Sequence, residues 1–167
     1  MHMQRKLFFE HIAQTSPAPP ALEISRGKGT YLFDSSGKKY RDLISGISVS
    51  NLGHGNKKII SAIKKQLDAH LHVLVYGEFI QSPQVNYAKL LADNLSGNLH
   101  TVYFVNSGAE AVEGALKLAK RFTGRTEIIA FKNAYHGSTH GALSVMGDET
   151  LKQPFRPLLP DVRLIEF

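Results

Sequence analysis

The second half of the chain repeats an order of apolar strand, tight corner and helix, and this order constrains the fold more than any other feature. Residues 101–105 (TVYFV) precede a helical pattern over 108–122, and residues 127–131 (EIIAF) precede another within 138–147. A last apolar segment, 161–167 (DVRLIEF), predicts a further strand. Continuous apolar strands that alternate with helices are typical of a parallel sheet with helices on both faces. We therefore expect an α/β fold with a mostly parallel sheet.

The first half of the chain predicts a small β element behind a stiff arm. Residues 30–34 (TYLFD) and 38–43 (KKYRDL) alternate in polarity around Gly37, a glycine that permits a tight turn. The stretch before them ends in SPAPP at 16–20, whose prolines cannot continue a helix. The expected order is an arm, a hairpin and then a loop rich in Gly, Ser and Asn.

Two amphipathic helices are expected between this loop and the first strand of the parallel sheet. Asn56 is a suitable N-cap for the first helix, which has isoleucines and leucines at helical spacing over 57–71. Ser82 and Pro83 have the order of a cap followed by a first-turn proline, and Gly97 is the expected end of the second helix.

Composition excludes several classes of protein. The chain has 167 residues, 43% of them hydrophobic, and no run approaches the roughly 18 apolar residues of a membrane span. Its first apolar stretch is too short for a secretory signal, so we expect a cytoplasmic protein without a membrane partner. The absence of cysteine excludes disulfides and thiolate metal sites. The net charge of +6 fits a phosphate ligand, whereas the basic residues are scattered, without a basic run beside stacking aromatics, so we expect no nucleic-acid partner.

Ser107, Gly108 and Ala109 stand at the corner between the first of these strands and its helix, which should end at Gly124. The first N–H groups of a helix lack partners within it and carry the positive end of its dipole, so the corner is a natural seat for an anion. Gly108 would let a phosphate approach the backbone, and Ser107 would add a hydroxyl donor. The alternative is that Ser107 is only a cap and Gly108 only a tight turn. Neither GxxxxGK[ST] nor GxGxxG is present at this corner, so common nucleotide motifs do not explain it.

Two carboxylates in the first turns of the same helix suit its dipole but would repel a phosphate if they pointed at the seat. We expect Glu110 and Glu113 to point away, with Glu113 paired to Lys117 four residues later. This arrangement would leave the seat free of negative charge.

Tyr135, His136 and Gly137 follow the next strand, and loops after successive strands of a parallel sheet open on the same side. An aromatic ring at position 135 would therefore stack on a flat ligand whose phosphate lies at the first corner. The alternative is an ordinary core tyrosine. His136 and His140 have the i, i+4 spacing of metal ligands, but the glutamate of HExxH and a third ligand are missing, so we expect no metal site.

Three stretches in this order, YRDLISGISVSNLGHGN, NSGAEAVEGALKLAKRFTGR and AYHGST, resemble the class III aminotransferases. These are pyridoxal-phosphate enzymes that include acetylornithine, ornithine and 4-aminobutyrate transaminases. The resemblance covers nearly the whole chain from about Gly29 onward, and it implies fold type I and a homodimer with active sites at its interface. Residues 1–54 would then be an N-terminal arm and part of a small domain, and 55–167 the N-terminal portion of the large, cofactor-binding domain.

The resemblance also assigns residues to pyridoxal phosphate. The family's phosphate-binding Ser-Gly-Ala falls on Ser107, Gly108 and Ala109. Its ring-stacking aromatic falls on Tyr135, and His136 lies beside the same face of the ring.

The substrate side is implied in the same way. The loop of Ile47, Ser48 and Val49 matches the segment that lines the substrate entrance, and Tyr76 stands where some relatives have a substrate-contacting aromatic. The implied reaction moves an amino group from an amino donor to a keto acid.

The family's Schiff-base lysine is expected beyond Phe167, where a strand that should be buried ends the sequence. We therefore expect the chain to be the N-terminal part of a longer protein and to be inactive alone. No lysine of this chain, including Lys132 after a strand, can be assigned in its place. Two alternatives stay open: a non-catalytic fragment or phosphate-binding α/β module, and an α/β structural domain without a ligand.

Overall fold

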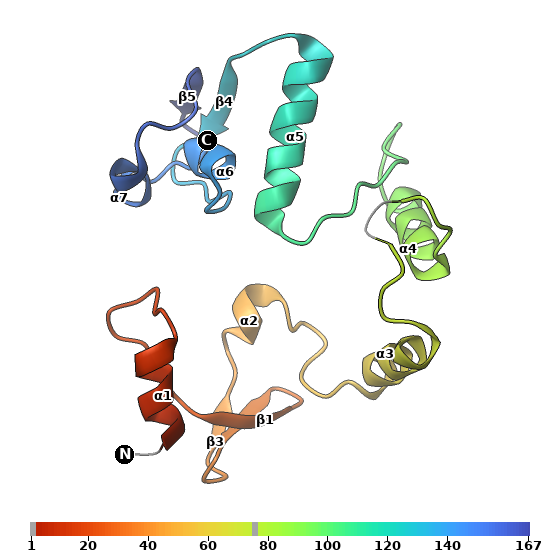
Figure 1. The fold of residues 1–167 in the computed structure, drawn as a ribbon, viewed down its shortest axis with the longest axis vertical. Helices are drawn as coiled ribbons and strands as arrows, with labels where there is room; N and C mark the ends of the chain where they lie inside the picture. The colour runs from red at the N-terminus through yellow and green to blue at the C-terminus, as the bar shows by residue number, and fades with distance from the viewer. Residues whose placement is uncertain (1–2, 75–76) are drawn as a thin grey trace. The chain divides into compact units, whose positions relative to one another are not determined.

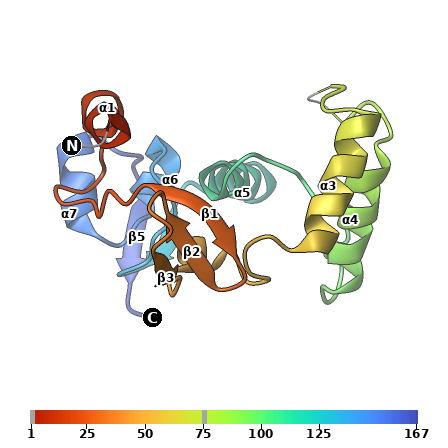
Figure 2. The ribbon, with the colours of Figure 1, turned by 90° about the horizontal axis from the view of Figure 1, so that it is seen from below.

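The computed structural model describes residues 3–74 and 77–167 and confirms the α/β class (Figure 1; Figure 2). The chain forms two compact units, Met1–Phe79 and Ile80–Phe167. The first contains a three-stranded antiparallel sheet, and the second contains a pair of parallel strands. Across the described ranges, every helix is too short or too polar to cross a bilayer.

The sheet of the first unit consists of β1 (Ile24–Lys28), β2 (Tyr31–Asp34) and β3 (Lys39–Arg41), with β2 in the middle. Antiparallel pairing of β2 with β3 confirms the predicted hairpin. The carboxylate of Asp34 accepts two backbone N–H bonds within the connecting turn, both at 2.9 Å. The sequence does not predict β1, because its residues (ISRGK) do not alternate in polarity. This strand depends on the second edge of β2, with which it pairs.

One face of this sheet carries four cations and two aromatic rings. The cross-strand register places them in two rows: Arg26, Phe33 and Lys39, and then Lys28, Tyr31 and Arg41. The guanidinium carbon of Arg26 lies 3.8 Å from the centre of the Phe33 ring, and Lys39 Nζ lies 3.7 Å from the centre of the Tyr31 ring. Cation–π contacts of this kind hold charged groups over aromatic rings. The view of the basic residues as scattered is therefore wrong for these four, which the fold gathers on one surface.

The described residues of the first unit also form α1 (Met3–His11), α2 (Ser45–Ser48) and α3 (Lys57–Ala69). α3 confirms the predicted helix, and the side chain of Asn56 caps it by accepting two first-turn N–H bonds. α1 lies in the segment expected to be an arm, ahead of the prolines. It is nine residues long and contains no buried residue, and it was not predicted from the sequence.

The helices of the second unit follow one another in this order: α4 (Ser82–Asp93), α5 (Gly108–Thr123), α6 (His140–Ser144), α7 (Glu149–Lys152) and the short 3₁₀ turn η1 (Gln153–Phe155). α5 starts as predicted and ends at Gly124, whose φ of 69° is left-handed. The prediction of Ser82 as the cap of α4 is wrong. The extended backbone of Gln81 takes the cap position, and Ser82 is the first helical residue.

The parallel strands are β4 (Ile128–Phe131) and β5 (Val162–Ile165), which confirm two of the three expected strands. The third prediction is wrong, because residues 101–105 form no strand. A strand needs a hydrogen-bonded neighbour, and no residue in the described ranges pairs with this segment. Tyr103 in its middle is accordingly 80% exposed.

The buried core of the second unit lies around α6 and the residues just after it. Ala142, Leu143, Val145 and Met146 are all buried, and Ala130 of β4 joins them. Most of the buried apolar side chains of this unit therefore belong to the segment that directly follows the Tyr135 loop.

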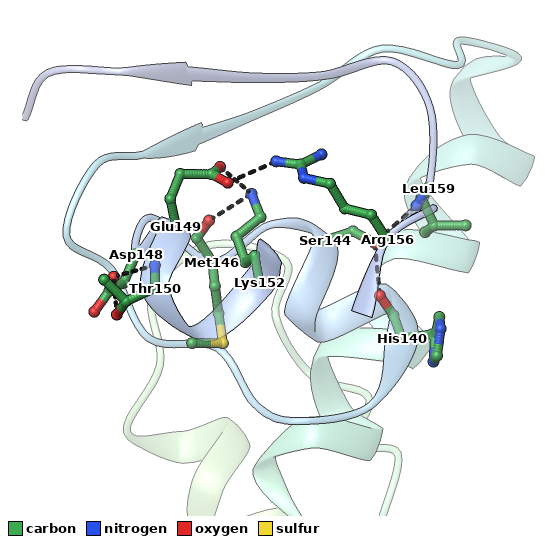
Figure 3. Close-up of polar contacts among 9 residues, drawn as sticks. All are labelled: His140, Ser144, Met146, Asp148, Glu149, Thr150, Lys152, Arg156 and Leu159. Carbon is green, nitrogen blue, oxygen red and sulfur yellow. Dashed lines mark hydrogen bonds and ion pairs between the residues drawn. The ribbon is translucent and has the colours of Figure 1, made fainter. Parts of the chain in front are cut away.

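Polar contacts fix α6 to the turns that follow it (Figure 3). Ser144 Oγ donates to a carbonyl of its own helix at 2.6 Å and accepts the N–H of Leu159 at 2.9 Å. The buried Lys152 donates from Nζ to the carbonyl oxygen of Met146 at 3.0 Å. These buried polar groups are hydrogen-bonded, so they hold the core in one arrangement.

Candidate functional site

The corner at Ser107 is a capped helix start. Ser107 has extended backbone angles, and its Oγ accepts the N–H of Glu110 at 3.1 Å. Glu110 in turn accepts the N–H of Asn106 at 2.6 Å, so its carboxylate is held on the chain just before the helix. The sequence predicts that Glu110 points away from the seat, and the structure places its carboxylate on the N–H of Asn106. Ser107 keeps its hydroxyl proton for a further acceptor, because it acts as acceptor in the cap.

Gly108 and Ala109 leave their backbone N–H groups available at this corner. Within the part of the chain that the structure describes, no acceptor faces either group. Gly108 does not have a left-handed φ, and a Cβ there would meet nothing within 4 Å. Neither backbone strain nor packing therefore requires glycine at this position. Without a side chain at Gly108, a bound anion can approach the backbone N–H groups at the start of the helix.

The loop after β4 packs against the same helix start. Gly137 has a φ of +133°, and a Cβ there would lie 2.7 Å from the Cβ of Ala109. Tyr135 is 68% exposed, and its hydroxyl lies 3.2 Å from Ser138 Oγ. His136 is half-buried. The close contact at Gly137 thus brings Tyr135 and His136 next to the first turn of α5.

These two segments enclose an open hollow of about 640 Å³. It is lined by Gly108, Ala109, Val112, Tyr135, His136, Gly137, Ser138 and Thr139. Ser107 directly precedes the lining residues. The structure therefore brings together the corner and the aromatic loop, which the sequence placed at one edge of the sheet.

Glu113 has a role that the sequence does not predict. Instead of pairing with Lys117, its Oε1 accepts the hydroxyl of Thr139 at 2.6 Å and the N–H groups of Gly141 and Ala142 at 2.8 and 3.1 Å. The Thr139 hydroxyl, followed by these backbone donors, lowers the pKa of Glu113 below its usual range. Glu113 thus caps α6 from α5. The sequence could not show this role, because Thr139 stands at the cap position of α6 and only the structure shows that its side chain makes no cap bond.

Ile47 and Val49 belong to the first unit, where they lie on an unusual turn. Successive residues 45–48 have φ values of 50°, 62°, 61° and 64°, so the chain is left-handed through Ile47 and Ser48. The Ile47 and Val49 side chains are 86% and 77% exposed. Tyr76, the remaining predicted substrate residue, lies outside the described residues.

An aspartate and a histidine anchor this turn. Asp42 Oδ1 accepts the N–H of Ile44 at 3.1 Å and of Ser45 at 2.8 Å, while Oδ2 lies 2.7 Å from Nε2 of His54. The Asp42 side chain is only 8% exposed. The bond to His54, followed by the N–H of Ser45, lowers the pKa of Asp42.

The other candidates have simple surroundings. His136 and His140 have no third ligand, and the described residues contain no group of three or more potential metal-binding side chains. Lys132 is exposed and pairs with Glu166 at 2.6 Å. A lysine that is exposed and paired with an exposed carboxylate is not desolvated and keeps its proton, so it shows no sign of activation as a nucleophile.

Comparison with protein families gives one match over most of the chain. The model of the family described as "Aminotransferase class-III" matches residues 12–167. An acetylornithine aminotransferase of Archaeoglobus fulgidus is 40% identical over 95% of this chain and 41% of its own length. One from Bacillus amyloliquefaciens is 46% identical over 83% of this chain and 58% of its own length. The chain thus spans less than two thirds of these curated relatives.

Solved structures give the same result for the fold. An adenosylmethionine-8-amino-7-oxononanoate aminotransferase from Methanocaldococcus jannaschii has a TM-score of 0.86 and 38% identity, covering 95% of this chain and 39% of its own. A taurine:2-oxoglutarate aminotransferase from Bifidobacterium kashiwanohense, solved with PLP and glutamate, has a TM-score of 0.87 and 31% identity. That match covers 98% of this chain and 37% of the solved one.

Proposed function

The chain belongs to the class III aminotransferases, which use pyridoxal phosphate, and on this basis we propose that the whole protein moves an amino group from an amino donor to a keto acid. This chain contributes the seat of the cofactor's phosphate and one face of its ring. The observation that carries the proposal is the hollow in which the first turn of α5 meets the loop of Tyr135. Acetylornithine is the donor we propose, because the two curated relatives bear that name.

The phosphate seat consists of Ser107, Gly108 and Ala109. Two backbone N–H groups and one hydroxyl proton would donate to the phosphate oxygens, at the positive end of a 16-residue helix. Gly108 admits the phosphate to the backbone because no side chain stands in the way. The Glu110 carboxylate is bonded to the N–H of Asn106, one residue before the seat, rather than to the N–H groups of Gly108 and Ala109.

The ring face consists of Tyr135 with His136 beside it. The exposed ring of Tyr135 offers an apolar surface for stacking, and the loop that carries it is fixed to α5 through Gly137. When bound, pyridoxal phosphate supplies the electron sink of the reaction, while the protein supplies orientation and electrostatics. The contribution of these residues is to hold the ring flat and shield one side of it from water.

The remaining parts of the proposal concern the whole protein. Ile47, Val49 and Tyr76 line the substrate entrance, and residues 1–54 and 55–167 belong to a small and a large domain. We propose a cytoplasmic homodimer that has no nucleic-acid partner and no membrane partner. The exposed apolar side chains of Ile47 and Val49 suit a surface that contacts substrate or a second subunit.

Residues 1–167 alone are proposed to be inactive, as a fragment that holds phosphate without catalysis. The support comes from two of its lysines. Lys132 is exposed and paired with Glu166, whereas Lys152 is buried and donates to the carbonyl of Met146. Neither side chain is placed as a nucleophile in the hollow.

Cofactor retention in the whole protein tests the seat. The double change Ser107→Ala with Gly108→Val should weaken pyridoxal-phosphate affinity far more than Tyr135→Phe, because Phe keeps the stacking surface. Each lost charge-assisted hydrogen bond should cost about 1.5 to 3 kcal/mol. The readouts are the dissociation constant of the cofactor and turnover of acetylornithine. Equal cofactor affinity in both variants would remove the seat assignment.

A further inference from the structure

We propose that Glu113 is a positioning residue that sets the phosphate seat and the ring-stacking loop at the spacing the cofactor requires, an inference that rests on the proposed function. The seat is on the first turn of α5, and the ring face is on a loop 26 or more residues later. Two halves of one site therefore come from separate segments. Contacts between α5 and the Tyr135 loop must fix the distance between these two halves.

One stripe of α5 makes both contacts between these segments. Ala109 and Glu113 are four residues apart, so they lie one above the other on the same helix face. At Gly137 the loop runs so close to Ala109 that an added Cβ would lie 2.7 Å from the Ala109 Cβ. One turn along, Glu113 reaches Thr139 and the first N–H groups of α6. The segment 137–142 is thus held to α5 at two successive points.

The second contact is polar, and the Glu113 carboxylate makes it where the α6 cap residue, Thr139, does not. The single oxygen Oε1 of Glu113 accepts all three bonds, from Thr139, Gly141 and Ala142. The side chain of Thr139 makes no cap bond to α6, because its hydroxyl donates to Glu113 instead. Gly141 has no side chain, and any Cβ there would collide with the Glu113 carboxylate. The fold therefore leaves room for this carboxylate and depends on it for the α6 N–H groups.

The consequence is specific to a ligand that uses both halves. Pyridoxal phosphate contacts the seat with its phosphate and Tyr135 with its ring, so its affinity depends on the spacing of the two. Inorganic phosphate would contact the seat alone, so its affinity does not depend on the spacing between the seat and the Tyr135 loop. A ligand held at two points gains from the effective concentration of its second contact, and that gain is lost when the geometry is wrong.

The experiment compares these two ligands on the whole protein, freed of cofactor and then titrated. Glu113→Ala should weaken pyridoxal-phosphate binding about tenfold or more while inorganic phosphate, measured by competition, stays within about twofold of the unchanged protein. Glu113→Gln should restore most of the affinity, because its Oε1 still accepts. Thr139→Val, which removes one donor, should show the same direction with a smaller loss. Glu127→Ala, at an exposed ion pair with Arg163, is the matched control and should change neither ligand.

Several outcomes would overturn the inference. Equal weakening of both ligands by Glu113→Ala and Thr139→Val would show a general structural role, and unchanged cofactor binding in both variants would show no role. Failure of Gln to restore affinity would also contradict it. If phosphate does not compete with the cofactor in the unchanged protein, the seat itself is wrong, and this inference falls with the proposed function.

Discussion

Replacing Gly137 by alanine should destabilise the second unit, because both its backbone and its surroundings exclude a side chain. Its φ of +133° is a conformation that L side chains rarely adopt. A Cβ there would lie 2.7 Å from the Cβ and 3.0 Å from the Cα of Ala109, and 3.2 Å from the Cβ of Ala142. The new methyl group would therefore be wedged between the start of α5 and α6.

Two costs add up in this variant. Holding a non-glycine residue at such a backbone angle costs about 1 to 3 kcal/mol. Carbon atoms prefer separations of about 3.5 to 4.0 Å, so α5 or the loop has to move by roughly 1 Å. Overpacking of this kind typically costs a further 1 to 3 kcal/mol, which gives a loss of about 2 to 6 kcal/mol in the free energy of unfolding.

Urea unfolding of the whole protein freed of cofactor, followed by circular dichroism, measures this loss without a contribution from cofactor binding. Gly108→Ala is the matched control, because the same methyl group would meet nothing within 4 Å and the backbone is not left-handed. It should change the free energy of unfolding by less than about 1 kcal/mol, and in the stabilising direction if at all. Equal stability of Gly137→Ala and Gly108→Ala would refute the close packing of the loop on α5.

Two further predictions concern buried polar groups. Lys152→Ala should lower the free energy of unfolding by about 1 to 3 kcal/mol, because the carbonyl of Met146 loses its donor. Lys89→Ala, in an exposed pair on α4, should cost less than about 0.5 kcal/mol in the same denaturation assay. Because the bond to His54 lowers the pKa of Asp42, its ionised form stabilises the fold above the ordinary Asp pKa of about 3.9, and this stability is lost as pH falls below it. The stability gap between the unchanged protein and Asp42→Asn should therefore narrow on acidification in urea titrations at stepped pH, and a constant gap would contradict the coupling.

The helices predicted correctly from the sequence are those that begin or end at a capping residue within the same stretch of chain. α5 needs only Ser107 to begin and Gly124 to end, and both act within one turn of the chain. Asn56 does the same for the start of α3. The sequence also predicted that the corner and the Tyr135 loop lie together, although the strand expected over 101–105 is absent and the two segments meet where Gly137 approaches Ala109.

Features that depend on distant partners were not predictable from the sequence. Residues 101–105 have a strand's composition but lack a paired neighbour among the described residues, whereas β1 has a weak pattern and a neighbour. Glu113 looked like half of a surface pair with Lys117, and its true donors lie 26 to 29 positions later in the chain. Only the packing of α6 against α5 determines that choice.

The left-handed turn of the first unit has a consequence for which residues it can accept. Ile47 is β-branched, and its φ of 61° is a conformation that costs such a residue about 1 to 3 kcal/mol. A glycine there would relax the backbone, yet the position holds an isoleucine whose side chain is 86% exposed. The backbone conformation at this position therefore makes isoleucine less stable than glycine would be. The Ile47 side chain is therefore better explained by contacts with another molecule than by a contribution to the stability of its own unit.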